Sequence, residues 1–255
     1  MSAAVTLAHD GALAIVTLDR PAARNALSVA DMARVGALVD DAARLGARCV
    51  LVRGTGGFFC AGRDLQDTRP GEEDTLDILR RHINPALARV RACPVPTVAA
   101  VRGPALGFGF GLALACDIAL VADNALLGSP FRNLGLLLDS AGHFHLKERV
   151  GRHRAAELIF TGRLLSGREA AAMGLVNRSL GALDLDHEAL VIARAIAAGP
   201  TAAFRASKEI LLADGDFAQV AEQEAIHQAR LIDGPDGREG VAAFQQKRRP
   251  RFTGE

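Results

Sequence analysis

The sequence predicts an α/β fold in which most strands run parallel. Segments with strand character alternate with helical patterns as far as about residue 122, which is typical of an α/β architecture. Two strand segments, RCVLVRG at 48–54 and PTVAAVRG at 96–103, are continuous apolar runs. Such runs are expected in a parallel sheet that is covered on both faces. The 255 residues suit one domain of ordinary size, with or without an appendage.

The N-terminal segments predict a hairpin followed by helices. Residues 5–8 and 12–18 have strand character and are joined at Asp10-Gly11, which is a strong hairpin signal. A helix is expected from Val29 to about Ala43, because its apolar residues fall on one stripe. A polar, charged loop at 68–74 leads to a second helical pattern at 76–91.

The rest of the chain begins with strands and then becomes mainly helical. A glycine-rich turn and a short helix to about Ala115 separate the strand at 96–103 from the strand at 117–122. Ser166 and Glu169 form a capping-box pattern that starts a helix. The remaining elements expected are helices at 140–150, 152–161 and 166–173, a short strand at 175–180, and helices at 185–198, 200–213, 216–231 and 237–247.

Composition and charge exclude several classes of function. Thirty basic and twenty-nine acidic side chains leave a net charge of +1, so neither nucleic acid nor a membrane surface is the expected partner. The four cysteines form no CxxC pair, and no acidic or histidine cluster has metal-ligand spacing. The N-terminus lacks the features of a signal peptide, and the longest apolar stretch is broken by glycines and Asp117. A cytoplasmic protein without a metal site is expected.

Two glycine-rich turns follow predicted strands. The stretch GFGFG at 107–111 has the wrong spacing for a dinucleotide fingerprint, and its helix is too short. It reads either as a tight turn or as a turn that points free N–H groups at a developing negative charge. The segment GTGGFFCAGRDL at 54–65 has the same layout, with a helix expected from near Asp64; its alternative is a loop with an N-cap aspartate. Together the turns could form an oxyanion hole.

Asp139 ends the apolar run GLLLD and raises a choice between two roles. It is either the N-cap of a helix beginning at Ser140 or a catalytic carboxylate. An apolar setting of Leu136 to Leu138 would raise the pKa of the carboxyl, whereas a helix N-terminus would lower it.

Four segments together resemble the crotonase family, the enoyl-CoA hydratases and isomerases. They are RNAL at 24–27, FCAGRDL at 59–65, PTVAAVRGPALGFGFGLALACDIALVADNA at 96–125 and GREGVAAFQQKRRPRFTG at 237–254. The resemblance implies a crotonase-like spiral of ββα turns at 1–195 and a C-terminal helical region at 196–255 that drives assembly into a homotrimer or a dimer of trimers. It also implies an acyl-CoA thioester as substrate, with coenzyme A entering as part of the substrate and no other cofactor.

The resemblance also assigns binding residues. The backbone N–H groups of Arg63 and Phe108 match the oxyanion donors, although the family usually has glycine at the second place. The Phe108 ring must therefore turn away from the acyl chain or shape its pocket. Arg24 and Ala26 in RNAL match coenzyme A-binding positions. Phe244 and Lys247 match residues that touch the adenine and ribose phosphate of a neighbouring subunit; their alternative is a solvated basic tail.

The two glutamates that define the hydratases are both missing, because Gly111 and Phe131 stand at their places. Asp139 instead matches the catalytic aspartate of isomerases of the family, including dienoyl-CoA isomerases and the ring-epoxide isomerases of phenylacetate catabolism. The closing KRRPRFTG also resembles the latter group. The sequence therefore favours an isomerase of fatty acid or phenylacetate catabolism. A hydratase or other lyase, and a non-catalytic subunit that binds coenzyme A, remain the alternatives.

Overall fold

The computed structural model describes residues 3–66, 68–69 and 71–255, so Pro70 in the predicted polar loop lies outside the described residues. The predicted hairpin is present: β1 (Val5–Asp10) and β2 (Leu13–Leu18) pair antiparallel. The helix that follows, α1 (Val29–Arg44), begins at Ser28, whose side chain accepts a hydrogen bond from the Asp31 N–H. Its apolar stripe buries Met32, Val35 and Val39, as the periodicity predicts.

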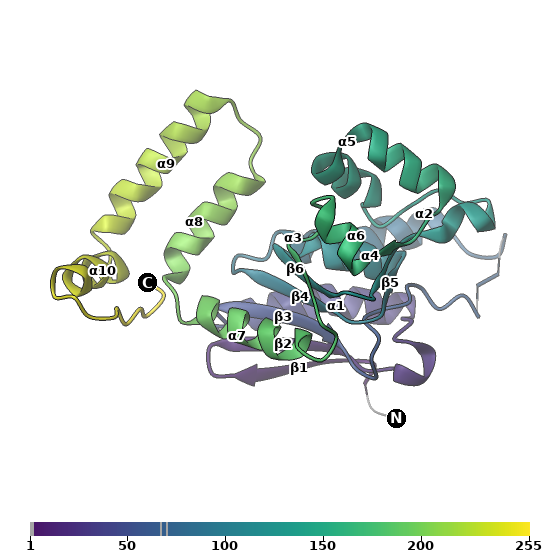
Figure 1. Ribbon diagram of the computed structural model, residues 1–255, viewed down its shortest axis with the longest axis horizontal. Helices are drawn as coiled ribbons and strands as arrows, with labels where there is room; N and C mark the ends of the chain where they lie inside the picture. Colours follow the sequence, from purple (N-terminus) through teal and green to yellow (C-terminus); the bar gives the residue numbers. More distant parts are fainter. Residues whose placement is uncertain (1–2, 67, 70) are drawn as a thin grey trace.

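A six-stranded sheet forms the centre of the fold (Figure 1). Its order is β1-β2-β3-β4-β6-β9, and every pair after the hairpin is parallel. The added strands are β3 (Cys49–Gly54), β4 (Thr97–Val101), β6 (Ile118–Ala122) and β9 (Arg178–Leu180). All five residues of β4 are buried, in agreement with the continuous apolar run. The predicted α/β fold with mostly parallel strands is confirmed.

A second, smaller sheet was not predicted, because its strands are only two or three residues long. It consists of β5 (Pro104–Leu106), β7 (Leu126–Gly128) and β8 (Leu165–Ser166), in the order β5-β7-β8. Between β5 and β6 lies α4 (Phe108–Ala115), and each of its eight residues is buried. A helix that is apolar all round belongs in the interior of a protein.

The other helices surround the sheets. The segment at 75–91 contains α2 (Thr75–Ile78), a π-helical turn (Leu79–Ile83) and α3 (Asn84–Arg91). The helix α1 lies behind the main sheet in Figure 1, and α7 (Leu185–Ala197) lies in front of it. The helix α6 (Gly167–Ala172) begins at the predicted capping box of Ser166 and Glu169. Two short 3₁₀ turns, Pro21–Ala23 and Pro130–Leu134, complete this part.

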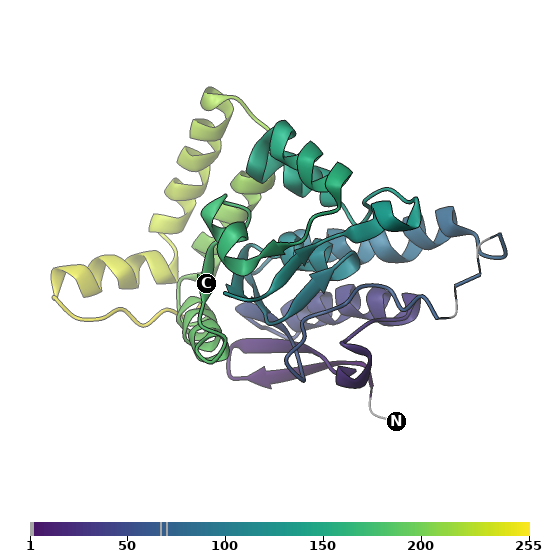
Figure 2. The same cartoon turned by 45° about the vertical axis from the view of Figure 1, so that its right-hand side comes forward.

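The last three helices extend away from the sheets in both cartoon views (Figures 1 and 2). They are α8 (Thr201–Leu212), α9 (Phe217–Ile232) and α10 (Pro235–Gln245), close to the predicted ranges. An ion pair fixes α8 to the sheet: Lys208 Nζ lies 2.7 Å from a carboxylate oxygen of Asp117, which also accepts hydrogen bonds from Thr97. The boundary between residues 195 and 196 stays a prediction.

No single helix within the described ranges has the length and hydropathy of a membrane span; only α7 and α8 taken together, bent by 104°, have both.

Two helix starts that the sequence predicts are wrong. Residues near Asp64 are extended, because Asp64 N–H donates to the Leu27 carbonyl in an isolated parallel bridge of Leu27 with Arg63. The helix predicted from Ser140 begins two residues later, as α5 (Gly142–Thr161). A break at Gly151 (φ 75°, ψ 166°) divides α5 into two helices, which confirms the predicted division into 140–150 and 152–161.

Asn25 connects the turn after β2 to the loop that follows β3. Its side chain is fully buried, and its backbone is left-handed with φ 54°, a conformation that asparagine tolerates better than most residues. Asn25 Oδ1 accepts a hydrogen bond from Arg20 N–H at 2.7 Å, and Nδ2 donates to the carbonyls of Thr55 and Phe58 at 3.0 and 2.7 Å. One amide therefore holds together two loops that lead into the FCAGRDL segment.

Asn25→Ala should lower the free energy of unfolding by about 2–4 kcal/mol, because it leaves buried backbone groups without their partners. Urea denaturation of the variant and the wild type measures the difference. Asn124→Ala, which removes an exposed amide, is the matched control and should change stability by less than about 0.5 kcal/mol. Equal stability of Asn25→Ala and the control would contradict this role of Asn25.

Candidate active site

The Arg63 N–H group faces away from the strand-like bridge that holds its segment. Leu27 N–H donates to the Gly62 carbonyl and Asp64 N–H donates to the Leu27 carbonyl, both at 2.9 Å. Because successive peptide groups in an extended chain point to opposite sides, the Arg63 N–H points away from Leu27. Among the described residues it has no backbone or side-chain acceptor, so it is available to a ligand.

Phe108 supplies a second free N–H group. It is the first residue of α4, and an N–H in the first turn of a helix has no acceptor within the helix. The turn before it depends on Gly107, whose φ is 51° and ψ −115°. The Phe108 ring is 2% exposed, so of the two orientations open to it the ring turns into the core.

The two donor segments lie next to each other. Cys60 N–H donates to the Pro104 carbonyl, and Leu106 N–H donates to the Cys60 carbonyl, both at 3.0 Å. A methyl group built on Gly62 would lie 3.7 Å from the Phe108 nitrogen. Gly62, the residue before the Arg63 donor, therefore lies next to the Phe108 donor. Two neighbouring N–H groups, one of them at the N-terminus of a buried helix, are suited to stabilise an oxygen that gains negative charge.

Asp139 does not cap a helix. The N-cap of α5 is Ala141, which has no side-chain cap, and the Asp139 carboxylate instead accepts a hydrogen bond from Ser140 Oγ at 2.8 Å. The N-cap interpretation of Asp139 is therefore wrong. The reason is that Ser140 and Ala141 are both left-handed, with φ 55° and 58°, and this turn delays the helix to Gly142.

The turn that carries Asp139 packs on the first turn of α4. A methyl group built on Gly111 would lie 2.3 Å from the Ser140 carbonyl oxygen and 2.8 Å from Ser140 Cβ. Gly111 and Phe108 are three residues apart and thus lie on the same side of the helix. The turn that carries Asp139 consequently packs on the face of α4 that Gly111 and Phe108 share.

The environment of Asp139 raises its pKa above the ordinary aspartate value. Burial is the largest cause, and it outweighs the Ser140 hydrogen bond, a bond from its own backbone N–H and the positive charge of Arg63, which all lower the pKa. The positive charge of the Arg63 side chain is the smallest of these causes.

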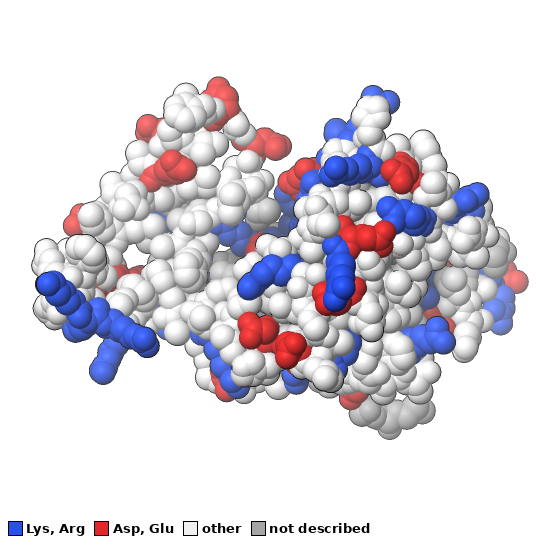
Figure 3. Space-filling view, viewed as in Figure 1, with Lys and Arg blue, Asp and Glu red and all other residues white. Residues whose placement is uncertain are grey.

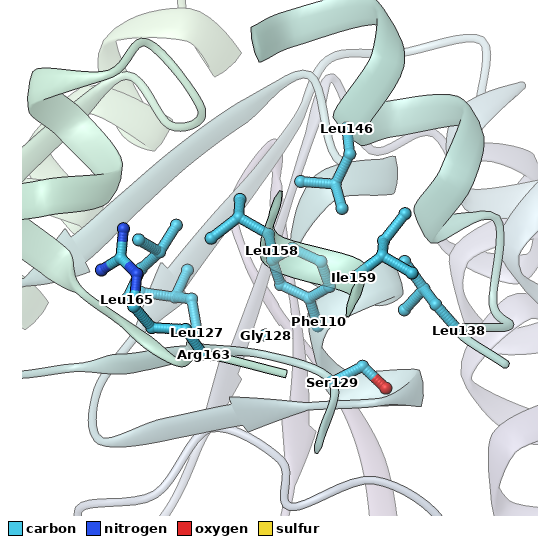
Figure 4. A pocket seen from close by; sticks show the side chains of 10 residues that line it. All are labelled: Phe110, Leu127, Gly128, Ser129, Leu138, Leu146, Leu158, Ile159, Arg163 and Leu165. Atoms are coloured by element: carbon cyan, nitrogen blue, oxygen red, sulfur yellow. The ribbon is translucent and has the colours of Figure 1, made fainter. Parts of the chain in front are cut away.

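The leucines before Asp139 do not all create that burial. Leu136 and Leu137 are 59% and 71% exposed, so the expectation that they surround the carboxylate is wrong. Leu138 alone is buried, because its side chain lines a cavity of about 10 Å³. Figure 4 shows Leu138 beside Ile159, with Phe110 nearby, in the lining of this cavity. Leu138 therefore fixes the chain immediately before Asp139.

Two further side chains shape the site through contacts that no local sequence pattern predicts. The Arg63 guanidinium binds both carboxylate oxygens of Glu73, at 2.7 and 2.9 Å, which ties the donor segment to the loop before α2. The Phe131 ring lies over the glycine turn, 3.2 Å from a methyl group built on Gly107. An aromatic ring thus stands at the position to which the resemblance assigns a hydratase glutamate.

The coenzyme A-binding candidates lie on two different parts of the chain. Arg24 is exposed beside the buried Asn25, and the Ala26 carbonyl accepts a hydrogen bond from Arg20 at 2.8 Å. Phe244 is 85% exposed and belongs to α10. The turn around residue 24 and α10 lie at opposite ends of the molecule in Figures 1 and 2. One chain therefore does not bring all four residues together.

The basic segment after α10 is held in place and is not a free tail. Lys and Arg side chains gather at this end of the molecule in Figure 3. Arg248 pairs with Glu239 at 2.6 Å, and that hydrogen bond is the main reason that the pKa of Glu239 falls to about 2. Further along, Thr253 and Gly254 N–H groups donate to Asp236. Residues 247–251 are nonetheless exposed, so the solvated basic tail KRRPR stays the alternative to coenzyme A binding.

Asp139→Asn should stabilise the protein at neutral pH. A carboxyl whose pKa is higher in the folded state than in the unfolded state contributes most stability below its unfolded pKa, and this contribution is lost as pH rises through the folded pKa. Asp139→Asn has no carboxyl at this position to ionise, so it does not lose this stability as the pH rises. Its melting temperature should thus exceed that of the wild type at pH 7, and the difference should shrink as the pH is lowered toward 3.8. A difference independent of pH would contradict the raised pKa.

Comparison with known proteins agrees with this geometry. A family model described as enoyl-CoA hydratase/isomerase matches residues 8–255. The protein called "Probable enoyl-CoA hydratase" in Rhodobacter capsulatus is 38% identical over 245 residues, which cover 95% of each chain. "Enoyl-CoA hydratase domain-containing protein 2, mitochondrial" of Bos taurus is 37% identical over 255 residues, which cover 95% of this chain and 85% of the relative.

Solved structures share the whole fold. The crystal structure of enoyl-CoA hydratase from Bacillus anthracis matches with a TM-score of 0.92 at 30% identity and covers 99% of this chain and 100% of the other. The crotonase-like α/β fold predicted from the motifs is thus confirmed. With a family model matched over nearly all residues and relatives above 30% identity over most of their length, the chain belongs to the enoyl-CoA hydratase/isomerase family, whose members act on acyl-CoA thioesters.

Proposed function

We propose that this protein is an acyl-CoA isomerase that moves a double bond or isomerises a ring epoxide, with Asp139 as its proton carrier. The observation that carries the proposal is the position of Asp139. Its carboxylate caps no helix and has a raised pKa, and it belongs to the turn that packs on the first turn of α4. A raised pKa brings a carboxylic acid closer to the working pH, where it accepts and returns a proton most efficiently.

Double-bond migration in a 3-enoyl-CoA then takes two proton transfers. Asp139 removes a proton from the carbon next to the thioester, and the electron pair of that C–H bond moves toward the carbonyl oxygen. The N–H groups of Arg63 and Phe108 stabilise the resulting enolate oxygen. When the enolate collapses, the carbon two positions further along takes the proton from Asp139, the double bond lies next to the thioester, and the carboxylate is restored.

Hydratase chemistry is the first alternative, and the names of the relatives favour it. The geometry at the two positions of the hydratase glutamates supports the isomerase instead. At Gly111 even a methyl group would lie 2.3 Å from a backbone oxygen, and Phe131 offers no group that binds or deprotonates water. The second alternative is a subunit that binds coenzyme A without catalysis, which would retain Arg24, Phe244 and Lys247 but show no turnover.

Coenzyme A binding between subunits is part of the proposal. Phe244 on α10 and Lys247 after it lie far from Arg24 within one chain, so the nucleotide end would be bound by a second copy. A homotrimer or a dimer of trimers supplies this second copy. Coenzyme A enters with the substrate, and no metal or other cofactor is proposed. The cytoplasmic location and the fatty acid or phenylacetate pathway stay predictions.

Asp139→Asn should lower the exchange of the α-proton of an acyl-CoA with deuterated solvent by about 10²–10⁴-fold, because general acid–base catalysis contributes on this scale. Its affinity for the same acyl-CoA should stay within about threefold. Proton NMR follows the exchange, and isothermal titration calorimetry measures the affinity. Asp41→Asn, which changes an exposed ion pair on α1, is the matched control and should exchange at the wild-type rate.

A panel of substrates separates the three candidate functions. The isomerase converts 3-enoyl-CoA or an aryl-derived epoxide and hydrates 2-enoyl-CoA poorly or not at all. Efficient hydration of 2-enoyl-CoA that survives Asp139→Asn would establish the hydratase. Tight binding without exchange or turnover of any substrate would establish the non-catalytic subunit.

Leu211→Glu should dissociate the proposed assembly. Leu211 on α8 is 82% exposed and Phe217 at the start of α9 is 90% exposed, which is expected of apolar side chains that a second chain covers. Sedimentation equilibrium should give three or six times 26.8 kDa for the wild type and a smaller mass for the variant. Leu45→Glu, at an exposed leucine after α1, should leave the mass unchanged. A wild type that sediments as a monomer would rule out the assembly.

A further inference from the structure

Ser140 combines three features that a serine in a surface turn does not need. It is 2% exposed, its φ of 55° is uncommon for a residue other than glycine, asparagine or aspartate, and its hydroxyl donates to Asp139 Oδ1 at 2.8 Å. Strained backbone of this kind persists only where the surrounding packing enforces it. The hydroxyl is therefore held in one place, next to the carboxylate that the proposed function requires.

Gly111 supplies the packing that places Ser140. The main-chain oxygen of Ser140 lies 2.3 Å from where a Cβ of residue 111 would stand, a distance that real side chains do not reach. The contact is with backbone, which cannot turn aside as a flexible side chain can. Leu138, whose side chain lies in the cavity shown in Figure 4, holds the chain on the other side of Asp139. The carboxylate thus lies between two fixed neighbours.

We propose that Ser140 and Gly111 act together as positioning residues for Asp139: Gly111 leaves room for the turn, and the Ser140 hydroxyl orients the carboxylate toward the space beside the Phe108 N–H. The proposal rests on the proposed function of Asp139. In this proposal position 111 must be glycine for a structural reason. The turn that carries the Asp139 carboxylate occupies the space that a hydratase glutamate would use.

Among the described residues, few charged groups act on Asp139. Arg63 acts on it from the donor segment and is itself paired with Glu73. The helix α4 carries no ionisable side chain. On α5, His143 is exposed, and burial lowers the pKa of His145 to about 4, so His145 is neutral near pH 7. A change in the titration of Asp139 on mutation of Ser140 can therefore be assigned to the lost hydrogen bond.

Ser140→Ala tests the hydroxyl, with two measurements on the full-length protein. Removing a donor from the carboxylate should raise the pKa of Asp139 by about one unit, as expected for a hydrogen bond to a charged group. Carbon-detected NMR titration measures this pKa without a substrate, and the resonance absent from Asp139→Asn assigns it. The acidic limb of the pH profile of α-proton exchange should move upward by the same amount, with kcat lowered about tenfold and KM within about twofold.

Ala141→Ser is the matched control. It places a hydroxyl one residue later, at an exposed position with nearly the same backbone conformation, and should leave the pKa and the profile unchanged. Gly111→Ala should lower kcat at least about tenfold, and adding Ser140→Ala to it should lower kcat little further, because the turn is already displaced. If Gly111→Ala does not fold, the Ser140→Ala measurements decide the proposal.

Gly111→Glu should not gain hydration of 2-enoyl-CoA, since it displaces the turn instead of restoring a water site. An unchanged pKa and an unchanged pH profile in Ser140→Ala, with Asp139→Asn inactive, would overturn the positioning role and leave the proposed function intact. Full exchange activity in Asp139→Asn would overturn the proposed function itself.

Discussion

The close approach of neighbouring backbone to α4 is the constraint on which the site depends. A methyl group on Gly109 would lie 2.3 Å from the Cys60 carbonyl oxygen, and one on Gly111 would lie 2.3 Å from the Ser140 carbonyl oxygen. The helix thus brings the FCAGRDL segment to one side and the Asp139 turn to another. Both contacts fall in its first turn, where the Phe108 N–H and the helix dipole favour negative charge. Larger residues at either glycine would separate the groups that the chemistry needs.

Burial of the Asp139 carboxyl also lowers the stability of the folded protein. Burying the Asp139 carboxyl disfavours its ionised form, and the raised pKa is the sign that the hydrogen bond from Ser140 and the charge of Arg63 only partly offset this effect. The protein keeps a carboxylate in a place where a neutral amide would be more stable. Such an arrangement is common where a group is retained for reactivity and not for packing.

Much of the fold could be predicted from the sequence, because its signals are local. The Asp10-Gly11 turn, the stripe of α1 and the capping box at Ser166 are each contained within a few residues, and each appears as expected.

The wrong predictions concern residues with distant partners. Asp64 reads as a helix start but donates its N–H to the Leu27 carbonyl, and Ser140 reads as a first helical residue but is held left-handed against Gly111. The same holds for the site. Asp139, Arg63 and Phe108 could be named from motifs, whereas the Glu73 and Ser140 contacts follow only from packing.

The complete burial of α4 has a consequence for how such a protein can diversify. No residue of this helix faces solvent, so nearly every substitution there disturbs the interior. The segment from residue 129 to 141 is different: it forms a 3₁₀ turn and an irregular stretch, with several exposed positions. Mutation can therefore exchange the side chains that this segment delivers to a fixed pair of N–H donors. New reactions on this fold are more readily acquired by changing what approaches α4 than by changing α4 itself.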